Sequence, residues 1–508
     1  MRLTWIVLLL VLISCTPPNT LPTISKPLDQ TLEHNTLAEG QALEIGFSIG
    51  DQEDLPENLV ASAVFDKPDT VTALAPISCQ VKLCKLEIRV ERKEVTSTKV
   101  LLSVEDKLGG KAVSSFNITI APRDVSITDE PALRTLIEQA QPGESIRLKT
   151  AASQSIKLSD QIMIDKELSL WGMGLDKTVL DAQALNRHFW IKPQAKVRFY
   201  DLTLTNGNAQ DDGSTLADEP LGGAIFNEGI LTLERTRVIR SKAVRGGGVF
   251  NLDSGILTLN ESVMGQKGAA NVASRSGGGL FNDSGKINVL KSQISFNEGT
   301  ERGGGIYNHF NGLLLVEDST FEGNISWDGT AIKNDNDQTG TATTIIRKSM
   351  IQNHQASQFE GGAIFNRGRL ELYDSTLNNN ATLLGEGGGI YSLGPTSVVL
   401  LDHTVLSNNT GAGNGGGINN TNANSTLIIR NGSQITGNKS QRTGGGIYNE
   451  GKLTITSDCA ITANIANTSN GGFVGGGMYS IGALVNTTAE TLKAVIKDNQ
   501  PDNISPIP

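Results

Sequence analysis

The phrase Gly-Gly-Gly-Ile-Tyr-Asn at 303–308 recurs in variant form along the second half of the chain. Such glycine phrases begin at 222, 246, 277, 303, 329, 361, 387, 415, 444 and 475, which gives a period of about 28 residues. Two other short patterns recur between them: Leu-x-Leu, as at 231–233, and Ser/Thr-x-apolar-x-x-Asn, as at 319–324. Self-similarity at such a period is the signature of a stacked solenoid.

The three recurring stretches are too short for helices, and their apolar residues alternate with a period of two, which is typical of strands. Three short strands joined by turns and repeated in every coil predict a triangular right-handed parallel β-helix. We expect about 13 coils over 127–500, in an all-β chain, followed by a short tail at 501–508. The glycines suit tight corners and close approach of neighbouring coils.

An asparagine closes most of the glycine phrases, and stacked amides in successive coils can bond to one another and to turn backbone. The predicted ladder consists of Asn227, Asn251, Asn282, Asn308, Asn334, Asn366, Asn420 and Asn449. A second ladder is predicted at Asn297, Asn324, Asn380, Asn409, Asn438 and Asn464. Cys459 takes the place of a Ser or Thr beside this second row, so we interpret it as a small inward residue and not as a nucleophile.

An aromatic residue precedes the ladder asparagine in most coils. If the aliphatic residue and the asparagine point inward, alternation places the aromatic outward, as a stripe. The stripe consists of Phe226, Phe250, Phe281, Tyr307, Phe365, Tyr391, Tyr448 and Tyr479. Two interpretations stay open: the rings stack on one another and cover backbone, or they bind sugar rings.

An amphipathic helix is predicted just before the coils. Leu133, Leu136, Ile137 and Ala140 share one face, Thr128 or Asp129 can cap its start, and 142–143 ends it. Such a helix can cover the open end of a strand stack.

The order of helix and strands over about 80 residues from 127 resembles the start of right-handed β-helix proteins of the pectate-lyase-like class. The paired GGAI/GGGI and FxxN phrases resemble the repeats of polymorphic outer-membrane proteins. The resemblance implies a bacterial surface β-helix.

Residues 21–122 alternate apolar and polar residues in short runs, such as 43–49, 86–90 and 116–120, separated by turn clusters. This pattern predicts a β-sandwich. Phrases such as "FSIGDQE" resemble the immunoglobulin-like or cadherin-like domains of bacterial surface proteins. We expect a spacer without a metal site.

The N-terminal 14 residues combine Arg2 with an apolar run at 3–13, which has the length of a signal peptide and is too short to span a bilayer. The sequence Leu-Ile-Ser-Cys at 12–15 resembles the lipobox of bacterial lipoproteins. The resemblance implies acylation of Cys15, a tether at 15–20, and a lipid anchor in the outer membrane, on either of its faces. The alternative is an ordinary cleaved signal with a chance cysteine.

Cys79 and Cys84 flank a short turn between apolar runs. A disulfide suits an exported protein, and two free buried thiols are the alternative. The spacing of Cys and His predicts no zinc site. We expect no metal and no cofactor.

A formal net charge of −10 and the lack of a basic run argue against a nucleic-acid partner. We expect a monomer whose partners are the membrane, through its lipid, and a glycan or a surface protein.

An enzyme would need two carboxylates and a basic group within about 6–9 Å of one another on one face. Asp335 and Asp337 in the irregular coil at 329–340 are a candidate ligand loop. The acidic stretch 211–219 is expected to be solvated surface. His309, His354 and His403 fall at non-equivalent repeat positions, and His354 replaces a ladder asparagine. No catalytic residue is assigned.

The sequence therefore favours a lipid-anchored envelope β-helix that acts as a structural, adhesive or glycan-binding module. The alternative is a carbohydrate-active enzyme, a polysaccharide lyase or hydrolase.

Overall fold

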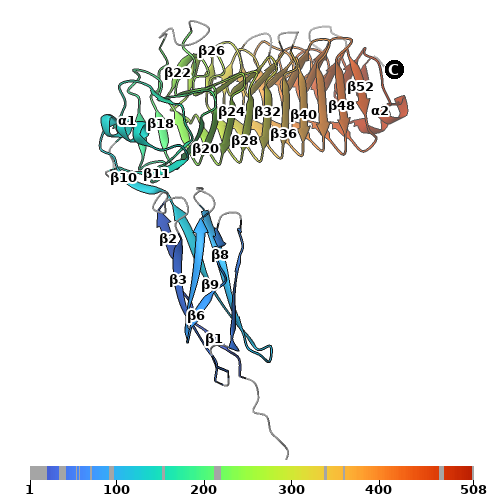
Figure 1. The fold of residues 1–508 in the computed structure, drawn as a ribbon. Helices are drawn as coiled ribbons and strands as arrows, with labels where there is room; N and C mark the ends of the chain where they lie inside the picture. The colour runs from blue at the N-terminus through green and yellow to red at the C-terminus, as the bar shows by residue number, and fades with distance from the viewer. Residues whose placement is uncertain are drawn as a thin grey trace, which may run out of the picture. The chain divides into compact units, whose positions relative to one another are not determined.

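A computed structural model describes residues 20–33, 42–52, 54–55, 58–68, 71–90, 96–150, 155–210, 219–336, 340–357, 361–467 and 474–505. The chain divides into two compact units, Met1–Arg123 and Asp124–Pro508. Figure 1 shows both units as ribbons. Among the described residues, no helix has the length and apolar character needed to cross a bilayer.

Unit 1 is built from two β-sheets that share one core. One sheet has the order β1-β3-β7-β5 with β6 beside β7, and the other has the order β2-β9-β8-β4. Alternate residues of the long strands, among them Phe47, Leu86, Leu102 and Phe116, are buried in the common core. The strands are β1 (Thr23–Ile24), β2 (Gln30–Glu33), β3 (Leu43–Gly50), β4 (Val60–Phe65), β5 (Val71–Ala73), β6 (Ser78–Gln80), β7 (Leu83–Val90), β8 (Thr96–Glu105) and β9 (Lys111–Ala121). This is the small β-sandwich that the alternating pattern predicted.

Unit 2 is the right-handed parallel β-helix predicted from the repeat. Three sheets of thirteen strands run along it, and the strands of successive coils pair in parallel (Figure 1). One continuous core of inward aliphatic residues extends from Ile127 to Ile496.

Sheet 1 contains the Leu-x-Leu stretches. Its strands are β10 (Arg123–Ser126), β11 (Glu144–Lys149), β14 (Leu168–Trp171), β17 (Lys196–Tyr200), β20 (Ile230–Glu234), β24 (Ile256–Asn260), β28 (Lys286–Leu290), β32 (Leu313–Glu317), β36 (Thr343–Arg347), β40 (Arg369–Tyr373), β44 (Val398–Asp402), β48 (Thr426–Arg430) and β52 (Lys452–Ile455).

Sheet 2 contains the strands that precede the second asparagine row. They are β12 (Ile156–Lys157), β15 (Val179–Asp181), β18 (Thr203–Thr205), β21 (Arg237–Ile239), β25 (Val263–Met264), β29 (Gln293–Ser295), β33 (Thr320–Glu322), β37 (Met350–Gln352), β41 (Thr376–Asn378), β45 (Val405–Ser407), β49 (Gln434–Thr436), β53 (Ala460–Thr462) and β56 (Ile496–Lys497).

Sheet 3 contains the strands that follow the glycines. They are β13 (Ile162–Ile164), β16 (Phe189–Ile191), β19 (Ile225–Asn227), β23 (Val249–Leu252), β27 (Leu280–Asp283), β31 (Ile306–His309), β35 (Ile332–Asp335), β39 (Ile364–Asn366), β43 (Ile390–Leu393), β47 (Ile418–Thr421), β51 (Ile447–Asn449), β55 (Met478–Ser480) and β57 (Ile504–Ser505). Strand β57 lies within 501–508, where the sequence predicted a tail.

A fourth sheet, the corner sheet, lies between sheets 2 and 3 in nine coils, although the sequence predicted only three strands per coil. Its strands are β22 (Lys242–Arg245), β26 (Val272–Ser276), β30 (Glu298–Gly299), β34 (Ile325–Ser326), β38 (Gln355–Ala356), β42 (Ala381–Thr382), β46 (Thr410–Gly411), β50 (Lys439–Ser440) and β54 (Ile465–Ala466). Most have only two residues, and their residue types differ from coil to coil, so no pattern identified them.

Helices cover both ends of the stack (Figure 1). Helix α1 (Glu130–Gln139) starts at Asp129, whose carboxylate accepts a bond from the amide of Ala132 at 3.0 Å, and its buried leucines join the core of the first coils. Helix α2 (Ala489–Val495) starts at Thr488 and buries Leu492 and Val495 at the other end. The sequence analysis predicted α1 and missed α2, which is only seven residues long.

Candidate functional site

The ladder asparagines lie at equivalent positions of successive coils, as predicted, and are fully buried near the ends of the sheet 3 strands. Each amide donates to the carboxamide oxygen of the next coil, from Asn227 to Asn251 at 2.6 Å and onward through Asn282, Asn308, Asn334 and Asn366 at 2.8–2.9 Å. Asn420 and Asn449 are joined in the same way at 2.8 Å. Ser392 and Ser480 continue the row. These residues bond to one another and to backbone carbonyls, so we assign them a structural role.

The second asparagine row is equally continuous. It runs from Asn271 through the predicted members to Asn499, and His354 stands in it with its Nδ1 accepting a bond from the amide of Asn324 at 3.1 Å. Cys459 is buried in the row that Ser433 occupies one coil earlier. His403 lies on the surface beside Asp374, with its Nδ1 at 2.7 Å from a carboxylate oxygen.

The aromatic stripe points away from the main core, as alternation predicted, yet most of it is covered. Phe226, Phe250, Phe281 and Tyr307 form a separate buried cluster with Trp190, in which successive ring centroids lie 4.9–5.7 Å apart. Arg245 lies over the Phe281 ring. Of the two interpretations, self-stacking describes this part of the row, and only Tyr448 and Tyr479 are half-buried.

Two coils break the aromatic row. Register pairing places Lys333 between Tyr307 and Phe365, and Asn419 between Tyr391 and Tyr448. Charged side chains lie at both breaks.

At the first break, the Lys333 ammonium lies 2.7 Å from Asp328 Oδ2 and 3.6 Å from Asp335 Oδ2. Arg367 lies 3.4 Å from the same Asp335 oxygen. The side chains of Asp328, Lys333 and Asp335 are only 8%, 2% and 2% exposed. These groups satisfy the spacing that an enzyme needs, but their burial keeps a polymeric substrate away from them.

Asp335 therefore lies at the end of β35 rather than in an exposed ligand loop, and Asp337 lies outside the described residues. One coil away, His309 Nδ1 lies 2.9 Å from an Asp283 oxygen. Within the part of the chain that the structure describes, no group of His, Cys, Asp and Glu could hold a metal ion.

At the second break, Glu386 bonds to Asn419, the residue that replaces the aromatic. Its Oε2 accepts a bond from Asn419 at 2.7 Å and its Oε1 from Asn414 at 3.2 Å. Burial raises the pKa of Glu386, and the charge of Glu450 raises it further. Glu450 in turn accepts a bond from the hydroxyl of Tyr448 at 2.8 Å.

Tyr448 completes this group of side chains. Burial and the Glu450 carboxylate both raise the pKa of its hydroxyl, so Tyr448 acts here as a hydrogen-bond donor. Its ring stacks on Tyr479 with the centroids 5.4 Å apart. The charge of Glu450 acts on Glu386, and a carboxyl group with a raised pKa on a partly exposed face is a candidate proton donor.

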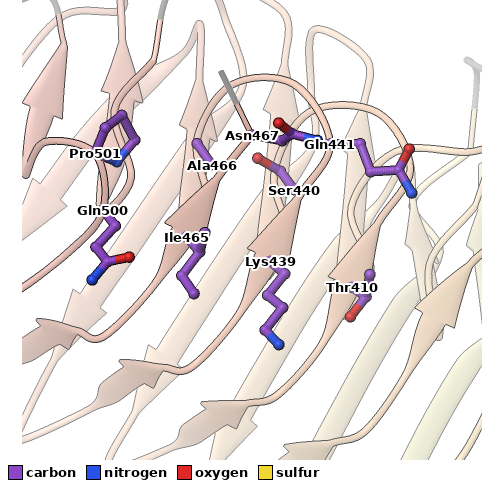
Figure 2. Close-up of a pocket in the computed structure, with 9 residues that line it drawn as sticks. All are labelled: Thr410, Lys439, Ser440, Gln441, Ile465, Ala466, Asn467, Gln500 and Pro501. Carbon is purple, nitrogen blue, oxygen red and sulfur yellow. The ribbon is translucent and has the colours of Figure 1, made fainter. Parts of the chain in front are cut away.

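A groove runs across the corner sheet on the same coils. It has a volume of about 570 Å³ and is lined by Thr410, Lys439, Ser440, Gln441, Ile465, Ala466, Asn467, Gln500 and Pro501. Figure 2 shows Thr410, Lys439, Ile465 and Gln500 in one row, each from the next coil. Among these described lining residues there is one cation and no carboxylate.

The loop at 441–443 joins the groove to the surroundings of Glu386. Gln441 lines the groove, and Thr443 donates to Asn414 at 2.7 Å. The charge of Arg442 lowers the pKa of Glu386 and so opposes the effect of burial. Sequence reasoning missed Glu386, Asn419, Lys333 and the groove. The loss of an aromatic residue from the repeat is the signal that could have found Lys333 and Asn419.

The remaining predicted residues lie in unit 1 and at the N-terminus. A disulfide joins Cys79 of β6 to Cys84 of β7. Cys15 and 211–218 lie outside the described residues, and Glu219, at the end of the acidic stretch, forms ion pairs with Arg245 and Arg275.

Comparisons with known proteins return distant matches only. No protein-family model and no curated protein sequence matches the chain. An exopolygalacturonase of family 28 from Yersinia enterocolitica is 9% identical with a TM-score of 0.39, covering 86% of this chain and 96% of the enzyme. The catalytic unit of a GH87 α-1,3-glucanase from Streptomyces thermodiastaticus is 10% identical with a TM-score of 0.36, covering 88% and 92%. Likeness at this level supports no transfer of activity.

Proposed function

We propose that the β-helix binds a linear acidic glycan in the corner-sheet groove, and that the chain is a bacterial envelope lipoprotein anchored in the outer membrane through Cys15. The observation that carries the first part is the groove itself, which presents Lys439 and several amides and hydroxyls and no carboxylate. The whole chain has a net charge of −10, yet no carboxylate lines this groove. The local charge therefore favours binding of an anionic ligand there.

The repeat of the fold suits a polymer. Strands of neighbouring coils are about 4.8 Å apart. A glycan that lies along the axis of the β-helix would therefore contact Thr410, Lys439, Ile465 and Gln500 in succession. The amides of Gln441 and Asn467 can donate to and accept from sugar hydroxyls. Carboxylate groups on the glycan would pair with Lys439.

The test compares two charge reversals on different faces. We expect Lys439→Glu to weaken binding of a uronate polymer such as polygalacturonate at least about tenfold, about 1.4 kcal/mol, in isothermal titration. Lys452 is also an exposed lysine, on β52, so Lys452→Glu makes the same change of charge outside the groove and should leave the affinity unchanged. Equal weakening by both variants, or no binding to any acidic glycan in a panel, would refute the proposal.

A second candidate function, a carbohydrate-active hydrolase, is favoured by the Glu386–Glu450 pair. A carboxyl group with a raised pKa, as in Glu386, can donate a proton to a leaving oxygen, and glycosidases use a second carboxyl group as base or nucleophile. Release of reducing ends from the bound glycan, lost in Glu386→Gln and in Glu450→Gln, would support this function. Binding without release in the wild-type protein would leave the binding role alone.

A further inference from the structure

Lys333 is among the largest fully buried side chains of the described residues, with 1% of its surface exposed. Its ammonium lies 4.1 Å from the centroid of the Phe365 ring and 5.9 Å from that of Tyr307. Two carboxylates share the same enclosure, and the nearer, Asp328, is at hydrogen-bond distance.

A buried ion pair of this kind recovers little of what its desolvation costs. A neutral amide in the same place would keep the short contact and remove two charges from a poorly solvated site. The amine and the carboxyl group that would form this amide are already in contact.

We propose that Lys333 and Asp328 become joined by an intramolecular isopeptide bond, with Asp335 as the group that carries the proton. Transfer of a proton from the Lys333 ammonium to Asp328 gives a neutral amine and a neutral acid. The amine lone pair attacks Cγ of Asp328, Asp335 accepts a proton from the attacking nitrogen and delivers it to the departing hydroxyl, and one water leaves. Nothing is oxidised or reduced, and Asp335 ends in its starting state.

The backbone holds the two reacting groups in this position. The carbonyl of Asp328 accepts bonds from Ser326 Oγ at 2.5 Å and from the amide of Gly303 at 3.1 Å. Lys333 is fixed in β35, which pairs with a strand on each side. Because the fold already holds the two groups in place, the entropy cost of bringing them together does not add to the reaction barrier.

A proton carrier must lie close to the reacting nitrogen, and Asp335 does. Its Oδ2 lies 3.6 Å from Lys333 Nζ within the same buried group, and Arg367 forms an ion pair with that oxygen at 3.4 Å. The bond would close a short ring across the turn from β34 to β35, at the coil that departs most from the repeat.

Peptide mass mapping of the intact, reduced protein tests the proposal. Trypsin should fail to cleave after an acylated Lys333, so residues 303–347 should appear as one peptide, lighter than its sequence by the mass of one water molecule. The Asp328-Gly329 dipeptide can also lose water by closing to a succinimide. That product leaves Lys333 cleavable and would appear as a lighter 303–333 peptide, which would overturn the proposal.

Two further samples separate the bond from a structural ion pair. Asp335→Asn keeps both reacting groups and removes the proton carrier, so we expect normal tryptic cleavage after Lys333 and no loss of mass. Lys192 is the internal control, because its ammonium also lies over an aromatic ring, that of Trp190 at 3.5 Å, and 3.9 Å from Glu228, but its side chain is 34% exposed. Complete cleavage after Lys333 at full mass in the wild-type protein would show that the pair is only ionic.

Discussion

His354 occupies a position that asparagine occupies in the coils on either side. The amide of Asn324 donates to its Nδ1, and its own amide donates to Asn380 Oδ1 at 3.2 Å, so the ladder continues through an imidazole. Because a protonated Nδ1 could no longer accept the bond from Asn324, the neutral ring is the form that fits. Burial lowers the pKa of His354 to about 4.

This residue makes stability depend on pH. In the unfolded chain the histidine has a pKa of about 6.5, so between pH 6.5 and 4 the unfolded state binds the extra proton and stability falls as pH falls. The free energy of unfolding falls by on the order of 3 kcal/mol between pH 6.5 and pH 4. We expect His354→Asn to restore an amide to the ladder and to reduce the drop in the urea-unfolding midpoint between pH 7 and pH 4.5.

The converse substitution is the control. Asn438→His places a second imidazole in the same row and should steepen the pH dependence. His188, which burial also brings to a pKa of about 4, contributes to the slope that remains in His354→Asn, as does Glu130, whose pKa is lowered, against the effect of burial, by its bonds to Ser159 and Arg134. An unchanged slope in both variants would contradict the role assigned to the buried ring.

At the scale of the coil, the glycine phrase combines two separate constraints. Gly415 adopts a φ of +69°, which favours glycine at the corner. Gly416 has an ordinary φ, but a Cβ there would lie 2.3 Å from the carbonyl oxygen of Gly445 and 2.4 Å from the backbone of Lys439. The second glycine is required because successive coils approach each other closely.

A pair of alanine substitutions separates these constraints. We expect Gly416→Ala to destabilise unit 2 by about 3 kcal/mol or more, because backbone must move to admit the methyl group. Gly268 has a φ of +75° and open space around its Cα, so Gly268→Ala should cost only about 1 kcal/mol. Urea-unfolding midpoints measure both, and equal small shifts would show that the coils can separate without strain.

The strands of sheets 1 to 3 and the cap α1 could be predicted because each repeats a pattern or shows a helical period. The corner sheet could not, because its outward row changes from Glu298 to Ile325 to Lys439 and its short strands follow only from the geometry of the turn. The candidate site was missed for a related reason. Glu386 precedes its glycines in the chain and bonds to Asn419 of the next coil only when the coils stack, so no single repeat records that contact.

At the scale of the whole molecule, the chain combines a small sandwich with a solenoid whose core is continuous from α1 to α2. In such a stack each coil contacts mainly its neighbours, so a feature confined to one or two coils leaves the rest of the architecture unchanged. Glu386 with Asn419, and the buried Lys333, lie where single coils depart from the repeat, whereas the groove follows the regular corner strands of successive coils. The regular coils set the positions of these features along the axis of the β-helix.

The proposed anchor is the last property that belongs to the whole molecule. If Cys15 is acylated, the protein should sediment with membranes and partition into detergent, whereas Cys15→Ala should appear in the soluble fraction. Cys459→Ala removes a buried thiol from the β-helix and should leave the distribution unchanged, which controls for the loss of a cysteine. Immunoblotting of membrane and soluble fractions checks both variants, and retention of Cys15→Ala in the membrane fraction would show that attachment does not depend on this residue.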